Sequence, residues 1–223
     1  MAERPETKSI IVTQAVQDYS VAHSSRPPDD VQRSLIEATR ALGGISMMQI
    51  SPDQGAFMTL LTRLVGAKLA VEVGTFTGYS SICIARGLAE GGKLVCCDVS
   101  EEWTAIAREH WEKAGVADRI DLRIGPAADT LQGLPADPPI DLAFIDADKP
   151  GYRIYYDEIV ERLRPNGLVL LDNVLWSGNV VDESDDSENT IAIRAINDHV
   201  AADARVEAVM LPIADGLTIA RKQ

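Results

Sequence analysis

Acidic and amide side chains follow two apolar runs in the second half of the chain. The run 140–145 is followed by Asp146, and the run 168–171 is followed by Asp172 and Asn173. Two carboxylates and one amide oxygen form a hard, all-oxygen ligand set, which suits Mg²⁺ and leaves positions for water or substrate oxygens. A single aspartate at a strand end more often caps the helix that follows. Two strand-end aspartates with Asn173 alongside favour a metal site over capping.

Lys149 lies three residues after Asp146, in the same predicted loop. An amine beside a metal-bound hydroxyl group could act as a general base where burial and the cation favour its neutral form. A loop lysine is otherwise a solvated surface charge. The spacing alone leaves both interpretations of Lys149 open.

A second segment with chemical potential follows the apolar run 69–73. It contains Gly74, Phe76 and Gly78, and the two glycines allow a tight turn and a close approach of the backbone to a ligand. The dinucleotide-binding pattern would have glycine where Phe76 stands, because that glycine lets the backbone approach a pyrophosphate. The turn therefore indicates a nucleoside ligand without a pyrophosphate.

Two carboxylates support this nucleoside site. Glu72 lies near the end of the run 69–73, and Asp98 ends the next run, where a carboxylate accepts hydrogen bonds from ribose hydroxyls. A glycine turn without them would more often be a simple helix-packing turn. An acidic pocket also suits a sulfonium cation better than a phosphate. Trp103 could cover an adenine ring or pack its own helix, and Trp176 could wall an aromatic acceptor or anchor its loop.

These residues need a scaffold that brings strand ends together. Five short apolar runs alternate with helical segments, which predicts an α/β fold with a parallel sheet covered by helices on both faces. Ligands of such sheets bind at the carboxyl ends of the strands, near the point where the strand order reverses. Two closing strands, 206–212 and 217–221, are joined by a short turn and must be antiparallel if they pair. The five predicted strands are 69–73, 94–99, 120–124, 140–145 and 168–171, and the helices between and after them are 80–89, 103–114, 127–134, 152–163 and 190–200.

Length and composition fit one globular domain, 1–223. The chain has 223 residues, of which 46% are hydrophobic and 25% charged, and its first part, 1–65, is predicted to be helical, with helices at 13–22, 29–42 and 53–65. The net charge of −13 disfavours nucleic acid as a partner, and no apolar run approaches the roughly 20 residues of a membrane span. The polar N-terminus lacks a secretory signal, and three cysteines suit a reducing compartment, so we expect a cytoplasmic protein.

The whole set of motifs resembles the cation-dependent class I O-methyltransferases, the family that contains caffeoyl-CoA and catechol O-methyltransferases. The resemblance covers nearly the whole chain, and its specificity lies in the combination and order of the motifs. They are EVGTFTGYS at 72–80, GPA at 125–127, DADK at 146–149 with Tyr152, Tyr155 and Tyr156, DN-x-LW at 172–176, and LP at 211–212 followed by DGLT at 215–218.

The resemblance implies a seven-stranded sheet with an antiparallel last strand, and a homodimer. It implies that residues 1–65 form the acceptor and dimer region and that 66–223 form the donor- and metal-binding core. Asp146, Asp172 and Asn173 would hold Mg²⁺, or another divalent cation such as Mn²⁺ or Ca²⁺, and Lys149 would match the base, so that Lys149 and Asp146 are the catalytic residues. S-adenosylmethionine would be the methyl donor, lined by Ile50, Glu72, Gly74, Thr75, Ser80, Asp98, Val99, Ala127, Asp146 and Asp148.

The implied reaction is an in-line transfer of the sulfonium methyl group to a catechol-like small phenolic acceptor. Plant members have asparagine where this chain has Ser177, and a Thr-Thr pair where it has Gln49 and Ile50. Both differences count against a CoA-ester acceptor. The alternatives are a nicotinamide-dependent oxidoreductase, which Phe76 argues against, and a catalytically silent donor-binding protein, which has no need of the trio at 146, 172 and 173.

Overall fold

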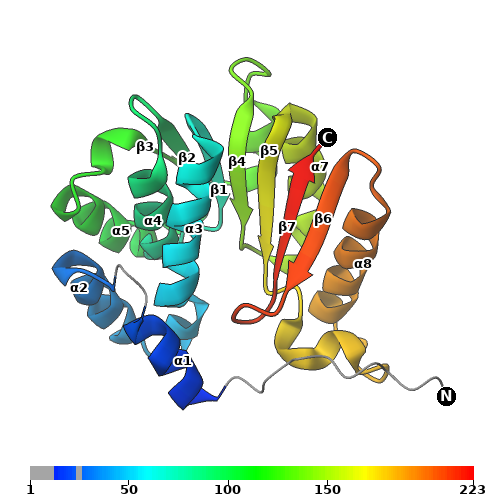
Figure 1. Ribbon diagram of the computed structural model, residues 1–223, viewed down its shortest axis with the longest axis horizontal. Coiled ribbons are helices and arrows are strands. Elements are labelled where there is room, and N and C mark those ends of the chain that lie inside the picture. Colours follow the sequence, from blue (N-terminus) through cyan, green and yellow to red (C-terminus); the bar gives the residue numbers. More distant parts are fainter. Residues whose placement is uncertain (1–12, 24–26) are drawn as a thin grey trace.

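A seven-stranded sheet forms the centre of the computed structural model, which describes residues 13–23 and 27–223 (Figure 1). The strand order is β3-β2-β1-β4-β5-β7-β6, and the first five strands along the chain are parallel. β7 is antiparallel to both of its neighbours, which confirms the predicted fold. The strands are β1 (Leu69–Val73), β2 (Lys93–Asp98), β3 (Ile120–Ile124), β4 (Ile140–Ile145), β5 (Leu163–Asp172), β6 (Val206–Leu211) and β7 (Leu217–Lys222).

Helices cover both faces of the sheet (Figure 1). Buried side chains of α2 to α5 join one hydrophobic cluster with the sheet, and those of α6 to α8 join the other. The helices are α1 (Gln14–Ala22), α2 (Asp30–Arg40), α3 (Pro52–Val65), α4 (Tyr79–Gly87), α5 (Glu101–Lys113), α6 (Ala127–Gln132), α7 (Tyr152–Arg162) and α8 (Glu188–Ala202), with short 3₁₀ turns η1 (Gly43–Met48), η2 (Ala117–Arg119), η3 (Lys149–Gly151) and η4 (Trp176–Val181).

Successive residues of each central strand alternate between the two clusters, as the pleat of a strand requires. In β4, Leu142 and Phe144 pack with α2 to α5, whereas Ala143 and Ile145 pack with α6 to α8. All four side chains are fully buried. A strand buried on both faces is apolar at most of its positions, which explains why these strands appear in the sequence as nearly continuous apolar runs.

The strand order reverses between β1 and β4, and three strand ends meet there. The amide of Asp146 donates to the carbonyl of Val73 at 2.8 Å, and the amide of Gly74 donates to the carbonyl of Cys97 at 3.0 Å. Gly74 has a φ of 92°, and a Cβ atom on it would lie 2.0 Å from the carbonyl oxygen of Asp146. Glycine is therefore required where the turn after β1 contacts the end of β4.

Several predicted boundaries were wrong. The turn signal at 165–167 indicates an interruption before strand five, but β5 begins at Leu163 and runs through it, with Asn166 at a φ of 62° and a register shift against β4. α6 ends at Gln132, two residues before the predicted end. Part of the predicted N-terminal region, residues 1–12 and 24–26, lies outside the described residues. Within the described residues, no helix is long and apolar enough to cross a membrane.

The contact at Gly74 can be tested with a matched pair of alanine substitutions. Gly115 also has a positive φ, 66°, but a Cβ on it would meet nothing within 4 Å. Gly115→Ala should therefore cost only the left-handed backbone strain of about 1–2 kcal/mol. Gly74→Ala should cost about 1–3 kcal/mol more, because the backbone of β4 must move. Denaturant unfolding of both variants measures this difference, and equal losses of unfolding free energy would refute the constraint.

Candidate active site

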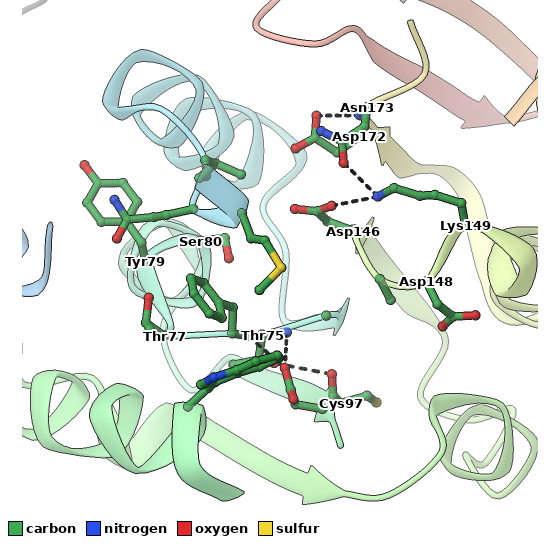
Figure 2. A pocket seen from close by; sticks show the side chains of 18 of the residues that line it. Thr75, Thr77, Tyr79, Ser80, Cys97, Asp146, Asp148, Lys149, Asp172 and Asn173 are labelled. Atoms are coloured by element: carbon green, nitrogen blue, oxygen red, sulfur yellow. Dashed lines mark hydrogen bonds and ion pairs between the residues drawn. The ribbon is translucent and has the colours of Figure 1, made fainter. Parts of the chain in front are cut away.

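A cavity of about 990 Å³ opens at the carboxyl ends of the parallel strands. Figure 2 shows Thr75 and Cys97 at one end of it and Asp146, Asp172, Asn173 and Lys149 together at the other. The fold thus brings the two predicted sites into one pocket. The predicted residues that line it are Ile50, Gly74, Thr75, Ser80, Asp98, Val99, Ala127, Asp146, Asp148, Lys149, Asp172 and Asn173.

Asp98 fixes the glycine turn after β1. One oxygen, Oδ2, accepts hydrogen bonds from the amides of Thr75 at 2.9 Å and Phe76 at 2.7 Å, and Oδ1 accepts from the amide of Ser100 at 2.8 Å. Phe76 can hold its unusual φ of 51° because its amide is anchored in this way. A carboxylate has about four acceptor positions, so Asp98 retains one for a ligand hydroxyl in the cavity.

Glu72 is the predicted donor residue that does not line the cavity. Its side chain is fully buried on the α4 side of the sheet, where Oε2 accepts from the hydroxyl of Ser81 and from the thiol of Cys96 at 3.3 Å. Burial raises the pKa of Glu72 to about 7, while Ser81 opposes the shift. Oε1 has no hydrogen-bond partner among the described residues. Glu72, which was predicted to line the methyl donor, thus lies in the core beneath the glycine turn.

The trio predicted to bind a metal, Asp146, Asp172 and Asn173, lies at the other end of the cavity. Asp172 is 2% exposed; its Oδ1 accepts from the amide of Asn173 at 2.8 Å, and its Oδ2 accepts from Nε2 of Gln54 at 2.8 Å. Burial and the charge of Asp146 raise the pKa of Asp172 to about 7, and burial raises that of Asp146. Two carboxylates held this close together and this deeply favour a bound positive charge.

Lys149 supplies one such charge and is not a surface lysine. Its side chain is only 8% exposed. Nζ donates to Oδ1 of Asp146 at 3.2 Å, to Oδ1 of Asn173 at 2.7 Å and to the hydroxyl of Tyr152 at 2.7 Å. The Tyr152 hydroxyl in turn donates to the backbone carbonyl of Asp172 at 3.2 Å. The ammonium therefore sits among the three residues predicted to bind a metal.

The two tryptophans both line the cavity, so their ligand-facing interpretation fits the geometry. Trp103 contacts Phe76 edge to face, with ring centroids 5.2 Å apart, and covers the glycine-turn end. Trp176 lies at the trio end, where Nζ of Lys149 is 5.5 Å from its ring centroid.

Sequence reasoning missed two polar partners of the site. Gln54, in the first turn of α3, is 1% exposed and orients Asp172 across 118 residues of sequence. Tyr155, in α7, donates from its hydroxyl to Oδ1 of Asp148 at 2.6 Å. No local pattern signals a contact as distant as that of Gln54. Tyr155 belongs to the motifs that carry the family resemblance, but the motif alone does not reveal its contact with Asp148.

The trio combines two carboxylates with an amide. Within the described part of the chain, no group of three or more His, Cys, Asp or Glu side chains is arranged to hold a metal ion. A metal at this site therefore depends on Asn173 as the third ligand.

Comparisons with known proteins identify the family. A profile of the O-methyltransferase family matches residues 22–223. A probable caffeoyl-CoA O-methyltransferase 1 of Dictyostelium discoideum is 40% identical over 212 residues, covering 93% of this chain and 92% of the relative. An O-methyltransferase from Bacillus cereus, solved in complex with SAH, has a TM-score of 0.85 at 34% identity and covers 94% of this chain and 97% of its own. TomG from Streptomyces achromogenes, involved in tomaymycin synthesis and solved with SAM, has a TM-score of 0.86 at 29% identity, covering 94% and 96%.

The chain belongs to the O-methyltransferase family. It is an S-adenosylmethionine-dependent O-methyltransferase of the caffeoyl-CoA O-methyltransferase type, so the predicted family and enzyme class are confirmed. The nicotinamide oxidoreductase and the silent donor-binding protein are thereby set aside.

The buried carboxyl of Glu72 predicts a pH dependence of stability. Its folded-state pKa of about 7 exceeds the ordinary 4.5, so the neutral carboxyl stabilises the fold fully below about pH 4.5 and this contribution is lost as the pH rises through 7. Relative to its value below pH 4.5, the contribution of Glu72 to the free energy of unfolding falls by about 3 kcal/mol by pH 8. Glu72→Gln should remove this contribution and make the pH profile of the unfolding free energy less steep, while the contributions of Asp146 and Asp172, which have the same sign, remain.

Denaturant unfolding between pH 5 and 8, with chelator present, measures this effect. Glu207→Gln is the control, because that carboxylate is 70% exposed and pairs with Arg221 at the surface. Parallel profiles for wild type and Glu72→Gln would contradict the assignment.

Proposed function

We propose that this enzyme methylates one hydroxyl of a catechol-like acceptor with the help of a divalent cation held by Asp146, Asp172 and Asn173. The observation that carries the proposal is the convergence of these three oxygen-bearing side chains with Lys149 at one end of a single cavity (Figure 2). The other end of that cavity holds the glycine turn and Asp98.

The trio fits a hard divalent cation on chemical grounds. All three side chains offer oxygen, the ligand that Mg²⁺, Mn²⁺ and Ca²⁺ accept. Burial raises the pKa values of Asp146 and Asp172, and the charge of Asp146 adds to the shift at Asp172, so a bound cation would stabilise both carboxylates in their ionised form. Gln54 and the amide of Asn173 already hold the Asp172 carboxylate in one orientation. These oriented oxygen ligands support binding of a cation here. Mg²⁺ would leave most of its coordination positions for water and substrate.

The donor end supports S-adenosylmethionine as the ligand. Asp98 has an acceptor position left for a ribose hydroxyl, and Phe76 and Trp103 offer aromatic surface to an adenine ring. The exposed Asp148, held by Tyr155, adds negative charge that suits a sulfonium cation. We assign Ile50, Gly74, Thr75, Ser80, Val99 and Ala127 to the same donor wall, and Glu72 to its support from below.

The chain's own residues then account for proton transfer and positioning. A bound divalent cation would supply Lewis acidity that lowers the pKa of an acceptor hydroxyl. Lys149, as the general base, takes the proton of that hydroxyl on Nζ when the amine is neutral. Tyr152 keeps Nζ of Lys149 at the trio, and Trp176 offers a flat apolar surface to the acceptor ring. Holding donor and acceptor in line within one cavity supplies the rest of the rate enhancement.

Replacing a proposed metal ligand tests the cation. Asp172→Asn should lower turnover by about two orders of magnitude, since Lewis-acid stabilisation amounts to several kcal/mol. Donor affinity by titration calorimetry should change little. Asp121→Asn is the control, because that carboxylate pairs with Arg123 on β3, outside the cavity. Full activity of the wild type in excess chelator would falsify the proposed cation.

Lys149→Met tests the base. The variant should lose about 10²–10⁴ of kcat, the usual contribution of a positioned general base, with a smaller effect on the acceptor KM. The limb of the kcat profile that rises with pH, which reports deprotonation of the base, should shift toward the pKa of the free acceptor hydroxyl. Lys113→Met, which removes an exposed lysine paired with Glu109, is the matched control. An unchanged pH–rate profile would remove Lys149 from this role.

The homodimer and the cytoplasmic location stay predictions. So does the role of residues 1–65 in binding the acceptor, although Met47, Met48 and Ile50 line the cavity and support it.

A further inference from the structure

The segment between β5 and α8 carries part of the cavity wall but has little regular structure. It runs from Asn173 to Ser187 and lies beyond the carboxyl end of β5 (Figure 1). Asn173 and Trp176 line the cavity from its first residues, and Asn189 lines it from the start of α8. The path of this segment therefore decides where Trp176, the proposed wall of the acceptor ring, stands.

The backbone of the segment is strained where it meets the cavity. Asn173, Trp176 and Ser177 have φ values of 54°, 47° and 53°. Gly178 follows at 88°. Left-handed backbone disfavours every residue except glycine, and it persists only where surrounding contacts hold it. The segment must therefore be held by contacts from other elements.

Arg194, in α8, makes most of these contacts after Trp176. Its Nε donates to the carbonyl of Val180 at 3.0 Å, and Nη1 donates to that of Asp185 at 2.8 Å. Its Nη2 donates to the carbonyls of residue 179, at 2.8 Å, and of residue 182. Four backbone carbonyls thus converge on one planar guanidinium, whose fixed fork of donors a lysine does not have.

The first residues of the segment are held by other side chains. Nδ2 of Asn197 in α8 donates to the carbonyl of Val174 at 2.8 Å. The amide of Ser177 donates to Oδ1 of Asp215 at 2.6 Å. These two contacts lie on either side of Trp176, and beyond Ser177 the hold passes mostly to Arg194.

The charge of Arg194 has a second effect on the segment. The run 182–188 carries five carboxylates, which repel one another. The guanidinium donates to the carbonyls of Asp182 and Asp185, so its positive charge lies inside this run. Arg194 therefore offsets part of the repulsion that favours a more open path of the segment.

We propose that Arg194 is a positioning residue for methyl transfer, which latches the segment 173–187 and so fixes Trp176 against the acceptor ring. The inference rests on the proposed function, in which Trp176 forms a wall of the acceptor site. Arg194 itself lies outside the cavity lining. Its loss should therefore weaken the binding and alignment of the acceptor, while the glycine-turn end of the cavity keeps its affinity for the donor.

Arg194→Met and Arg194→Lys test the latch with the methyl ester of 3,4-dihydroxycinnamic acid as acceptor, together with S-adenosylmethionine and Mg²⁺. In Arg194→Met, kcat/KM for the ester should fall about ten- to a hundredfold, with a raised acceptor KM, because a slightly misplaced reactant loses that much. Arg194→Lys should lose less, since it keeps the charge without the fork. Donor affinity by titration calorimetry should stay unchanged in both.

The control is Arg123→Met, which removes an arginine that pairs with Asp121 on β3, outside the cavity. It should leave the acceptor KM, kcat and donor affinity unchanged.

A double-mutant cycle shows whether Arg194 acts through the ring of Trp176. Trp176→Ala removes the proposed wall, so Arg194→Met should have little further effect on kcat/KM in that background. A general structural role of Arg194 predicts additive losses instead. Hydrogen exchange gives a readout without acceptor: backbone amides of residues 176–187 should exchange faster in Arg194→Met, and those of the central strands should not.

The outcomes separate this inference from the proposed function. A wild-type enzyme that methylates neither the ester nor catechol itself overturns the proposed function and this inference with it. Wild-type turnover with an acceptor KM that both Arg194 variants leave unchanged, with additive losses in the cycle, or with an equal loss of donor affinity, overturns the role of Arg194 and leaves the methyltransferase standing. Arg194→Lys, the milder substitution, keeps the test valid if Arg194→Met fails to fold.

Discussion

The contact between Gly74 and the backbone of Asp146 is the constraint on which the site depends. It occurs where the strand order reverses, so the turn after β1 and the end of β4 must share one small space. The glycine turn and Asp146, a proposed metal ligand, can lie side by side because Gly74 has no side chain to separate them. Asp98 then holds the turn from the β2 side with two amide hydrogen bonds. Donor and acceptor chemistry can therefore meet within one cavity.

Buried negative charge is the second theme, and the protein uses it in two ways. Glu72 lies in the core beneath the turn, where burial favours its neutral form and hydroxyl and thiol donors serve one oxygen. Asp146 and Asp172 lie at the cavity, where one ammonium is shared between them. Glu72 avoids a buried negative charge by binding a proton. The pair of Asp146 and Asp172 favours binding of a cation. Gln54 links Asp172 to the N-terminal helices that border the acceptor end.

The sequence predicted the sheet well because strands covered on both faces are apolar at most positions, as β4 is from Leu142 to Ile145. It predicted the strand-end residues because parallel strands place their carboxyl ends together, which located Asp98, Asp146 and Asp172 correctly at one edge. The sequence-based prediction failed where contacts between residues far apart in the sequence, or the direction of a side chain, decide the structure. Period-two alternation turns Glu72 away from the cavity, and the contact of Gln54 with Asp172 spans 118 residues. The turn signal at 165–167 lies inside β5 as an irregularity, between Leu163 and Leu168, which both pair with β4. The burial of Lys149 likewise follows from packing that spacing cannot reveal.

The central claim is that the strand-end trio holds a divalent cation beside the methyl donor. Anomalous scattering from a crystal grown with Mn²⁺ and S-adenosylhomocysteine tests it most directly. The account predicts one strong peak about 2.1–2.3 Å from oxygens of Asp146, Asp172 and Asn173, with the Lys149 ammonium displaced from two of them. A peak bound elsewhere, or an unaltered Lys149 network with no peak at saturating Mn²⁺, would contradict it.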